Sequence, residues 1–279
     1  MIEIVFLFVL ALIWILFALV QDMRTTEIAN WLNISLVIFA LGFRFFYSLF
    51  FSTGFDFFYQ GLIGLAIFYV LGNLLYNAKM FAGGDAKLFV SLGAVLPISG
   101  NFIQNISGFL FFLLAFFVIG AIYSIIASIV LGIQNYSAFR REFRKQFGEN
   151  KKKMMLSLLA GIILIVLGYI SLYFFFFGIL AFILPYLYLY AKAVDEAAMV
   201  KEIRPEKLRE GDWLYKDAKA GKRIIRATWD GLSKQEILLL KKYNKKVWIR
   251  TGVPFTAVFF FTAMIYFYFL LIGLRYSFW

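Results

Sequence analysis

Seven apolar runs dominate this sequence, and most have about the 20 residues that an α-helix needs to cross a bilayer once. They cover residues 2–21, 30–51, 57–78, 86–99, 103–133, 154–192 and 251–274. Apolar residues make up 63% of the chain and charged residues only 16%, whereas a soluble domain has about a quarter charged residues. We therefore predict an all-α polytopic membrane protein. The first run lacks a basic start and a small-residue cleavage pattern, so we expect it to be retained as a helix.

The run 154–192 is too long for one span. As a single helix its 39 residues would extend over roughly 58 Å, about twice the hydrocarbon thickness of a bilayer. Two interpretations stay open. The run is either one long helix that extends beyond the membrane or a hairpin of two short spans that turns near Gly168–Gly178. The hairpin, which we prefer, predicts eight transmembrane helices, within a range of six to eight.

The basic residues predict the orientation. Seven of the 28 Lys and Arg lie in 134–155, and fifteen lie in 193–250. Because basic loops stay on the cytoplasmic side, both segments are expected there. If the N-terminus is outside, five crossings place 134–155 inside. The two crossings of a hairpin then return the chain, so that 193–250 is also inside. We expect an integral protein of the cell membrane with both termini outside.

Residues 193–250 form the only sizeable soluble segment, and we expect it to be small, cytoplasmic and α/β-like. A helix over 195–201 and a strand-like piece over 222–226 are predicted. Ser233 and Glu236 have the spacing of a capping box at the start of a further helix. The segment is too small to bury much of a core alone, so we expect it to rest on the membrane domain. Its fifteen basic and nine acidic residues favour an anionic lipid surface as a partner.

Two aspartates stand in short polar breaks between the apolar runs. Asp22 follows the first run, and Asp85 precedes the run 86–99. The two runs between them each cross the membrane once, so the chain returns to the face that it left. Asp22 and Asp85 are therefore predicted to lie at the same face, which the basic segments identify as cytoplasmic.

The chain has no histidine and no cysteine. Ser–His and Cys–His nucleophile pairs and Cys/His zinc sites are thus excluded. A carboxylate pair or a Ser–Lys dyad remains for hydrolysis. Lys87 and Ser91 have the helical spacing of such a dyad, but a snorkelling lysine beside a packed serine is the simpler interpretation.

Two neighbouring carboxyl groups do not easily ionise together. The charged one can activate a water molecule, while the protonated one polarises a peptide carbonyl. We predict Asp22 and Asp85 as catalytic residues, with no metal or cofactor. Gly83 and Gly84 would let the backbone approach an extended substrate. Arg24 and Lys87 are candidates for substrate binding or site tuning, although a solvated interfacial rim explains them equally well.

The predicted organisation has five parts. They are a catalytic membrane domain of five spans (1–133), a basic cytoplasmic loop (134–153), an additional hairpin or long helix (154–192), a cytoplasmic soluble segment (193–250) and the last transmembrane helix (251–279).

Other functions fit some of these features. Taken singly, Asp22 can mark a helix end, and Asp85 can be an N-cap. As a pair they would suit an ion- or proton-coupled small transporter, which would place acidic residues at the bilayer midplane. A non-catalytic assembly scaffold would use the basic segment for docking, and a presenilin-like protease would cut within a helix. No nucleic-acid partner is expected, and the oligomeric state stays open.

Several motifs together suggest a known family. Asp22, Arg24, Ile28 and Asn30 form one motif, and Gly83-Gly84-Asp85-Ala86-Lys87 forms the second. Near the C-terminus, three further pieces add support: Glu210–Leu214, Gly231–Ser233 and Ile249–Phe255. The chain resembles the archaeal type IV prepilin/preflagellin (prearchaellin) peptidases, which are polytopic aspartyl proteases of the GxGD class.

The resemblance has departures. Ala82 stands where a strict GxGD motif has glycine, and Ala257 stands where the family often has a second proline. The tetracysteine zinc loop of the bacterial branch is absent. The resemblance implies an endopeptidase that acts on membrane-inserted prepilin or prearchaellin. It would remove a short basic leader at the cytoplasmic face, just before the hydrophobic helix of the precursor.

Overall fold

The computed structural model describes residues 2–25, 27–51, 54–221, 223–229, 231–243 and 246–276. The chain divides into two compact units. The first unit combines Met1–Ser124 with Val253–Trp279, and the second covers Ile125–Gly252. The last predicted helix, 251–279, therefore belongs with the N-terminal helices, and its final three residues lie outside the described part.

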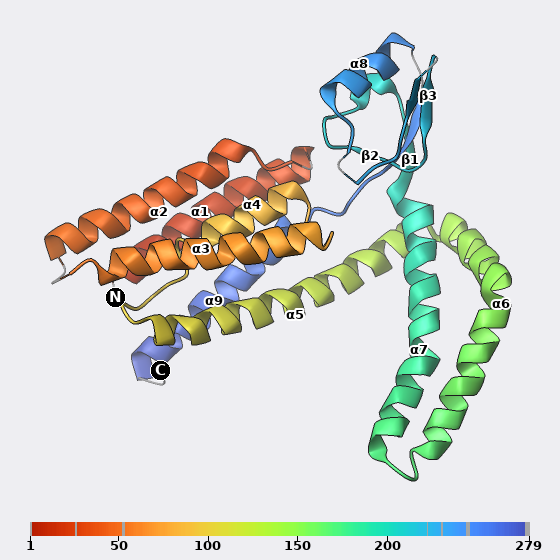
Figure 1. The fold of residues 1–279 in the computed structure, drawn as a ribbon, viewed down its shortest axis with the longest axis horizontal. Helices are drawn as coiled ribbons and strands as arrows, with labels where there is room; N and C mark the ends of the chain where they lie inside the picture. The colour runs from red at the N-terminus through yellow and green to blue at the C-terminus, as the bar shows by residue number, and fades with distance from the viewer. Residues whose placement is uncertain are drawn as a thin grey trace. The chain divides into compact units, whose positions relative to one another are not determined.

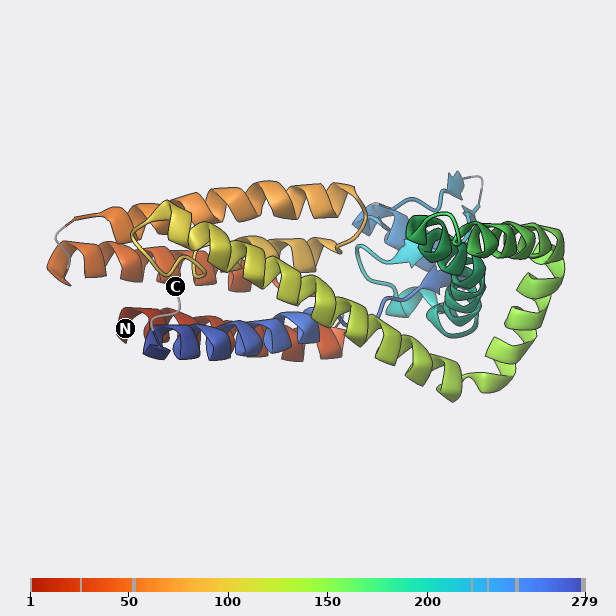
Figure 2. The same ribbon diagram turned by 90° about the horizontal axis from the view of Figure 1, so that it is seen from below.

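The first unit is a bundle of helices that run along one another (Figures 1 and 2). Its elements are α1 (Ile2–Thr25), α2 (Asn30–Phe51), α3 (Asp56–Asn77), α4 (Gly83–Leu92), the first part of α5 (Phe102–Gln134) and α9 (Thr256–Tyr276). Large aromatic side chains fill the interior, among them Phe68, Phe89, Phe112, Phe116 and Phe259. Among the described residues, α1, α2, α3, α5 and the stretch Leu172–Met199 are long and apolar enough to cross a membrane. These helices indicate an integral membrane protein, but the predicted count of eight spans is not confirmed.

The prediction of a helical span over 86–99 is wrong. Helix α4 has only 10 residues, about 15 Å, and turns and extended chain follow it. Its first half lies beside the start of α2, where Lys87 Nζ donates to Asn30 Oδ1 at 2.6 Å. The chain that follows lies near the start of α3, since Asn105 Nδ2 at the start of α5 donates both to the carbonyl oxygen of Ser99 at 2.9 Å and to Gln60 Oε1 on α3 at 3.0 Å. A half-helix and an irregular segment thus run from one end of the bundle to the other.

Arg44 on α2 explains how this irregular segment is held in the bundle. Its side chain is fully buried and donates to the carbonyl oxygens of Phe57 at 2.9 Å, Ala94 at 2.8 Å and Val95 at 3.0 Å. A fourth hydrogen bond goes to the carbonyl oxygen of Pro97. Irregular backbone at membrane depth is tolerated only where its polar groups are satisfied inside the protein. The guanidinium group of Arg44 thus binds backbone carbonyls inside the bundle.

In the second unit, two helices replace the ambiguous run 154–192. Helix α6 (Tyr136–Leu167) and helix α7 (Leu172–Val194) form the hairpin that Figure 1 shows in green. Glycines let the two helices approach each other closely. A Cβ on Gly178 would lie only 2.9 Å from the carbonyl oxygen of Gly161, so a larger residue would not fit there. The alternative of one long helix is wrong. The segment 134–153, predicted as a loop, is mostly the start of α6, which is consistent with its many helix-favouring Arg, Lys, Glu and Gln residues.

The rest of the second unit is a small folded segment. Its elements are the π-helical turn η1 (Asp195–Met199), β1 (Val200–Ile203), the 3-10 turn η2 (Pro205–Lys207), β2 (Trp213–Leu214), β3 (Ala218–Ala220), β4 (Arg223–Ile225), α8 (Lys234–Lys242) and β5 (Val247–Arg250). The antiparallel strands have the orders β1-β5-β2 and β3-β4. A helix over 195–201 was expected, but a strand begins at Val200. Of the predicted strand 222–226, residue 222 lies outside the described part.

The predicted capping box is confirmed. Ser233 Oγ accepts from the Glu236 amide, and the Ser233 amide donates to Glu236 Oε2 at 2.9 Å. Helix α8 directs Ile237 and Leu240 into a small apolar core that also contains Val247 and Ile249. The segment thus has a hydrophobic core of its own, although the sequence predicts little core for its length.

Candidate active site

Asp22 lies in the last turn of α1, and the first residue of α9 binds its carboxylate. Thr256 donates to Asp22 Oδ2 twice, from its hydroxyl at 2.7 Å and from its backbone amide at 3.2 Å. Asp22 is 7% exposed, and Thr256 is fully buried. The N-terminus of a helix carries partial positive charge and free amide groups, so α9 favours a negative charge on Asp22.

Asp85 lies in the first turn of the short helix α4 and is half-buried. Gly84, directly before Asp85, packs against Ile28, six residues after Asp22, so the start of α4 lies against the chain that leaves α1. In the described parts of the chain, no hydrogen-bond donor contacts the Asp85 carboxyl group, in contrast to the two donors on Asp22. The structure thus brings the two predicted aspartates together and gives them different surroundings.

Aromatic packing explains how residues so far apart in sequence meet. Phe81 stands two residues before the glycine pair of α4, and the centre of its ring lies 5.6 Å from that of Phe116, 6.3 Å from that of Phe259 and 6.4 Å from that of Phe255. Phe116 and Phe259 also contact each other at 4.8 Å. These rings join the start of α4 to the start of α9. Since Asp85 lies on α4 and α9 binds Asp22, the same packing brings both carboxyl groups to one end of the bundle.

The two glycines before Asp85 have different surroundings. A Cβ on Gly84 would lie 3.4 Å from both the Cβ and the amide nitrogen of Ile28, so Gly84 permits close packing of the loop between α1 and α2. A Cβ on Gly83 would meet only a ring carbon of Tyr76, at 3.9 Å. Ala82 has φ −70° and ψ 159°, which any L-residue adopts easily. Alanine in place of the first motif glycine therefore causes no strain here.

The two predicted basic residues do not bind the aspartates in this structure. Arg24 is exposed at the end of α1. Lys87 donates to Asn30 Oδ1, and its side chain lines a groove between α2, α3 and α4. Arg24 and Lys87 each lie two residues after one of the catalytic candidates in the sequence, but neither forms an ion pair with that aspartate among the described residues. Their predicted roles remain predictions.

Two residues at the site were missed in the sequence. Thr256 directly follows the motif Ile249–Phe255, so that motif could have identified it. Tyr123 on α5 donates to the carbonyl oxygen of Pro254 at 2.6 Å and thereby fixes the chain just before Thr256. Nothing in the local sequence around Tyr123 predicts this contact. Within the described residues, no group of three or more Asp or Glu side chains could hold a metal ion.

Comparison with known proteins supports the resemblance found in the sequence. Residues 9–125, which include Asp22 and Asp85, match the type IV leader peptidase family. A preflagellin peptidase of Methanocaldococcus jannaschii is 31% identical over 90 residues, which is 32% of this chain and 38% of the relative. The chain thus matches less than half the length of this curated relative. No solved structure matches the chain. The resemblance to the type IV leader peptidases is therefore supported over residues 9–125.

Proposed function

From the match to the type IV leader peptidases, we propose that this chain is a membrane-bound aspartic endopeptidase. It would remove short basic leaders from pilin-like or archaellin precursors. The proposal depends on one observation above all. Asp22 and Asp85 are both inside the matched segment and lie at one end of a helical bundle, Asp22 in the last turn of α1 and Asp85 in the first turn of α4. A carboxylate pair is one kind of hydrolytic machinery that a chain without histidine or cysteine can still provide, and Lys87 of the possible Ser–Lys dyad binds Asn30 instead.

The surroundings of the pair favour one distribution of the proton. Asp22 accepts two hydrogen bonds at a helix N-terminus and would be the ionised member. Asp85, which has no donor among the described residues, would hold the proton. Asp22 then removes a proton from water as the water oxygen attacks the peptide carbonyl carbon, and Asp85 transfers its proton to the carbonyl oxygen. When the C–N bond breaks, Asp22 protonates the leaving amine, and Asp85 recovers a proton from the new carboxyl group.

The position of the pair suits a precursor that is inserted in the membrane. Asp22 and Asp85 lie where α1 ends and α4 begins, so a peptide bond just outside a membrane-embedded helix could reach them. The basic stretches in 134–155 and 193–250 support a cytoplasmic location for this end of the bundle. Both termini would then lie outside, since α1 runs toward the pair and α9 runs away from it.

The test uses membranes that contain the full chain and candidate precursors. Asp22→Asn and Asp85→Asn should each abolish leader removal while the protein still inserts in the membrane. Asp56→Asn, which changes a third aspartate in the same unit at the start of α3, is the matched control and should cleave normally. Sequencing the N-terminus of the product identifies the bond that is cut. Robust cleavage by either site variant in purified form would refute the proposal, and a scaffold would tolerate both changes.

A further inference from the structure

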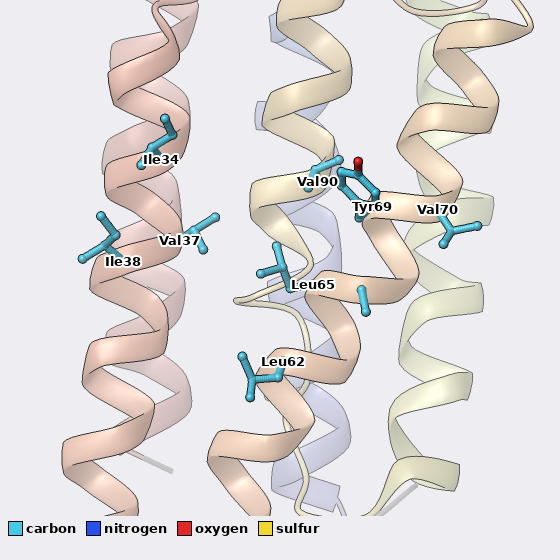
Figure 3. Close-up of a pocket in the computed structure, with 9 residues that line it drawn as sticks. Ile34, Val37, Ile38, Leu62, Leu65, Tyr69, Val70 and Val90 are labelled. Carbon is cyan, nitrogen blue, oxygen red and sulfur yellow. The ribbon is translucent and has the colours of Figure 1, made fainter.

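A groove lies between α2 and α3, and helix α4 forms part of its wall. Its first part, of about 630 Å³, contains the polar residues Asn30, Asn33, Asn73, Lys87 and Ser91. Its second part, of about 560 Å³, is almost wholly apolar. Ile34, Val37, Tyr69 and Val90 line both parts, so the two are continuous. Figure 3 shows the apolar part, with Val37 on α2 directed toward Leu65 on α3.

Asn33 is the unusual residue of this groove. It is 5% exposed, and neither Nδ2 nor Oδ1 of its carboxamide has a hydrogen-bond partner. An unsatisfied buried polar group costs about 1–3 kcal/mol, so a carboxamide in this position is expected to bind something that the isolated chain lacks. The missing partner must offer both an acceptor and a donor inside the membrane domain. A lipid acyl chain offers neither.

The start of a helix satisfies this requirement. The first turn of every α-helix has backbone amide groups without partners inside the helix, and a peptide bond next to it adds a free carbonyl. In a membrane these groups need a protein partner. Asn33 lies one turn along α2 from Asn30, which binds Lys87 two residues after Asp85. The polar part of the groove therefore adjoins the segment that carries Asp85, and the apolar part leads away from it.

We propose that the α2–α3 groove is the docking site for the apolar helix of the precursor, with Asn33 binding the backbone of its first turn. This inference rests on the proposed function. The wall from Leu62 to Val70 on α3 is about 12 Å long, enough to cover about two turns of a docked helix. The chain before that helix would continue past Gly83, where little side-chain density obstructs it, toward the two aspartates.

Crosslinking tests the docking directly, because the chain has no cysteine of its own. The probe is a synthetic peptide with a short basic leader, about 20 apolar residues and one cysteine in the second turn of its apolar helix. Val37→Cys and Leu65→Cys, each in the full chain in lipid vesicles, should form a disulfide with the probe. Val118→Cys is the matched control, since Val118 is an exposed valine on α5 outside the groove. It should give only a background yield.

Kinetics test the role of Asn33. Asn33→Leu removes the carboxamide and should raise KM for the probe about two- to tenfold, with little change in kcat, because a net hydrogen bond contributes about 0.5–1.5 kcal/mol. Ser48→Ala removes another buried unpaired polar group from α2, outside the groove, and should leave KM unchanged. If Asn33→Leu and Ser48→Ala change KM equally, Asn33 affects only the stability of α2 and does not bind the precursor.

The outcomes separate the two proposals. Cleavage of the probe without crosslinks at Val37→Cys and Leu65→Cys overturns the docking site and leaves the peptidase. A probe that is crosslinked but never cut overturns the peptidase alone, and a probe that is neither crosslinked nor cut overturns both. Labelling of the groove by a photoactivatable acyl-chain phospholipid that excess probe does not displace would assign the groove to lipid. A disulfide between two copies of the chain would assign it to self-association.

Discussion

Replacing Thr256 by valine tests the distribution of the proton between the two aspartates. The substitution keeps the branched shape of a fully buried side chain and removes only the hydroxyl that donates to Asp22 Oδ2 at 2.7 Å. The backbone amide of residue 256 still donates at 3.2 Å. A hydrogen bond to a charged group contributes about 1.5–3 kcal/mol to the stability of the ionised form. Its loss therefore makes the charged state of the pair less favourable.

The sign of the effect follows from the proposed mechanism. If Asp22 must be ionised to activate water, a less stable anion keeps its proton to a higher pH. The acidic limb of the pH–rate profile should then move to higher pH. At about 1.36 kcal/mol per pH unit, the expected shift is about one to two units. Activity lost at mildly acidic pH should return as the pH rises. Thr256→Ser, which retains the hydroxyl, should remain close to the wild-type profile.

The assay measures initial rates of leader removal by the purified full chain from acidic to alkaline pH, together with thermal unfolding in detergent. A profile of unchanged shape, with or without a uniform loss of rate, would refute the assignment of Asp22 as the ionised residue. Equal shifts for Thr256→Val and Thr256→Ser would show that packing at α9, and not the hydroxyl, controls the pair. Unfolding data separate either result from a general loss of structure.

Three further changes test the fold around the site. Arg44→Leu should destabilise the membrane unit by about 3 kcal/mol or more, because several buried carbonyls lose their donor. Arg44→Lys should restore little of this stability, since lysine lacks the planar guanidinium group. Thermal unfolding in detergent measures both variants. Gly93→Ala should destabilise the membrane unit by about 1–3 kcal/mol, because the new Cβ would lie 2.6 Å from the carbonyl oxygen of Gly64. A Cβ on Gly42 would meet nothing within 4 Å, so Gly42→Ala should leave the stability unchanged or raise it in the same assay. Asp212→Ala should retain most leader removal, because Asp212 accepts from the Arg209 amide in a turn of the small folded segment; severe loss of activity with normal insertion would contradict this.

Local sequence patterns were sufficient for much of this protein. Run lengths predicted the helices of the membrane unit other than α4, since a bilayer requires about 20 apolar residues per crossing. Counting crossings between Asp22 and Asp85 predicted that the two residues share one end of the bundle, and the structure has Asp22 in the last turn of α1 and Asp85 in the first turn of α4. The capping box at Ser233 was also readable, because both of its hydrogen bonds connect residues three positions apart. Each of these features depends on neighbours along the chain.

Other features depend on contacts that no local pattern encodes. The run 86–99 is apolar enough to suggest a full helix, but the carbonyls held by Arg44, some fifty residues earlier, allow the chain to leave the helix after Leu92. Thr256 and Asp22 are 234 positions apart and meet only because α9 packs against α1. Composition and spacing thus determined a helical membrane protein with two acids at one end. Tertiary packing decided which acid is held by a helix N-terminus and where a groove opens, because those properties arise between helices and not along them.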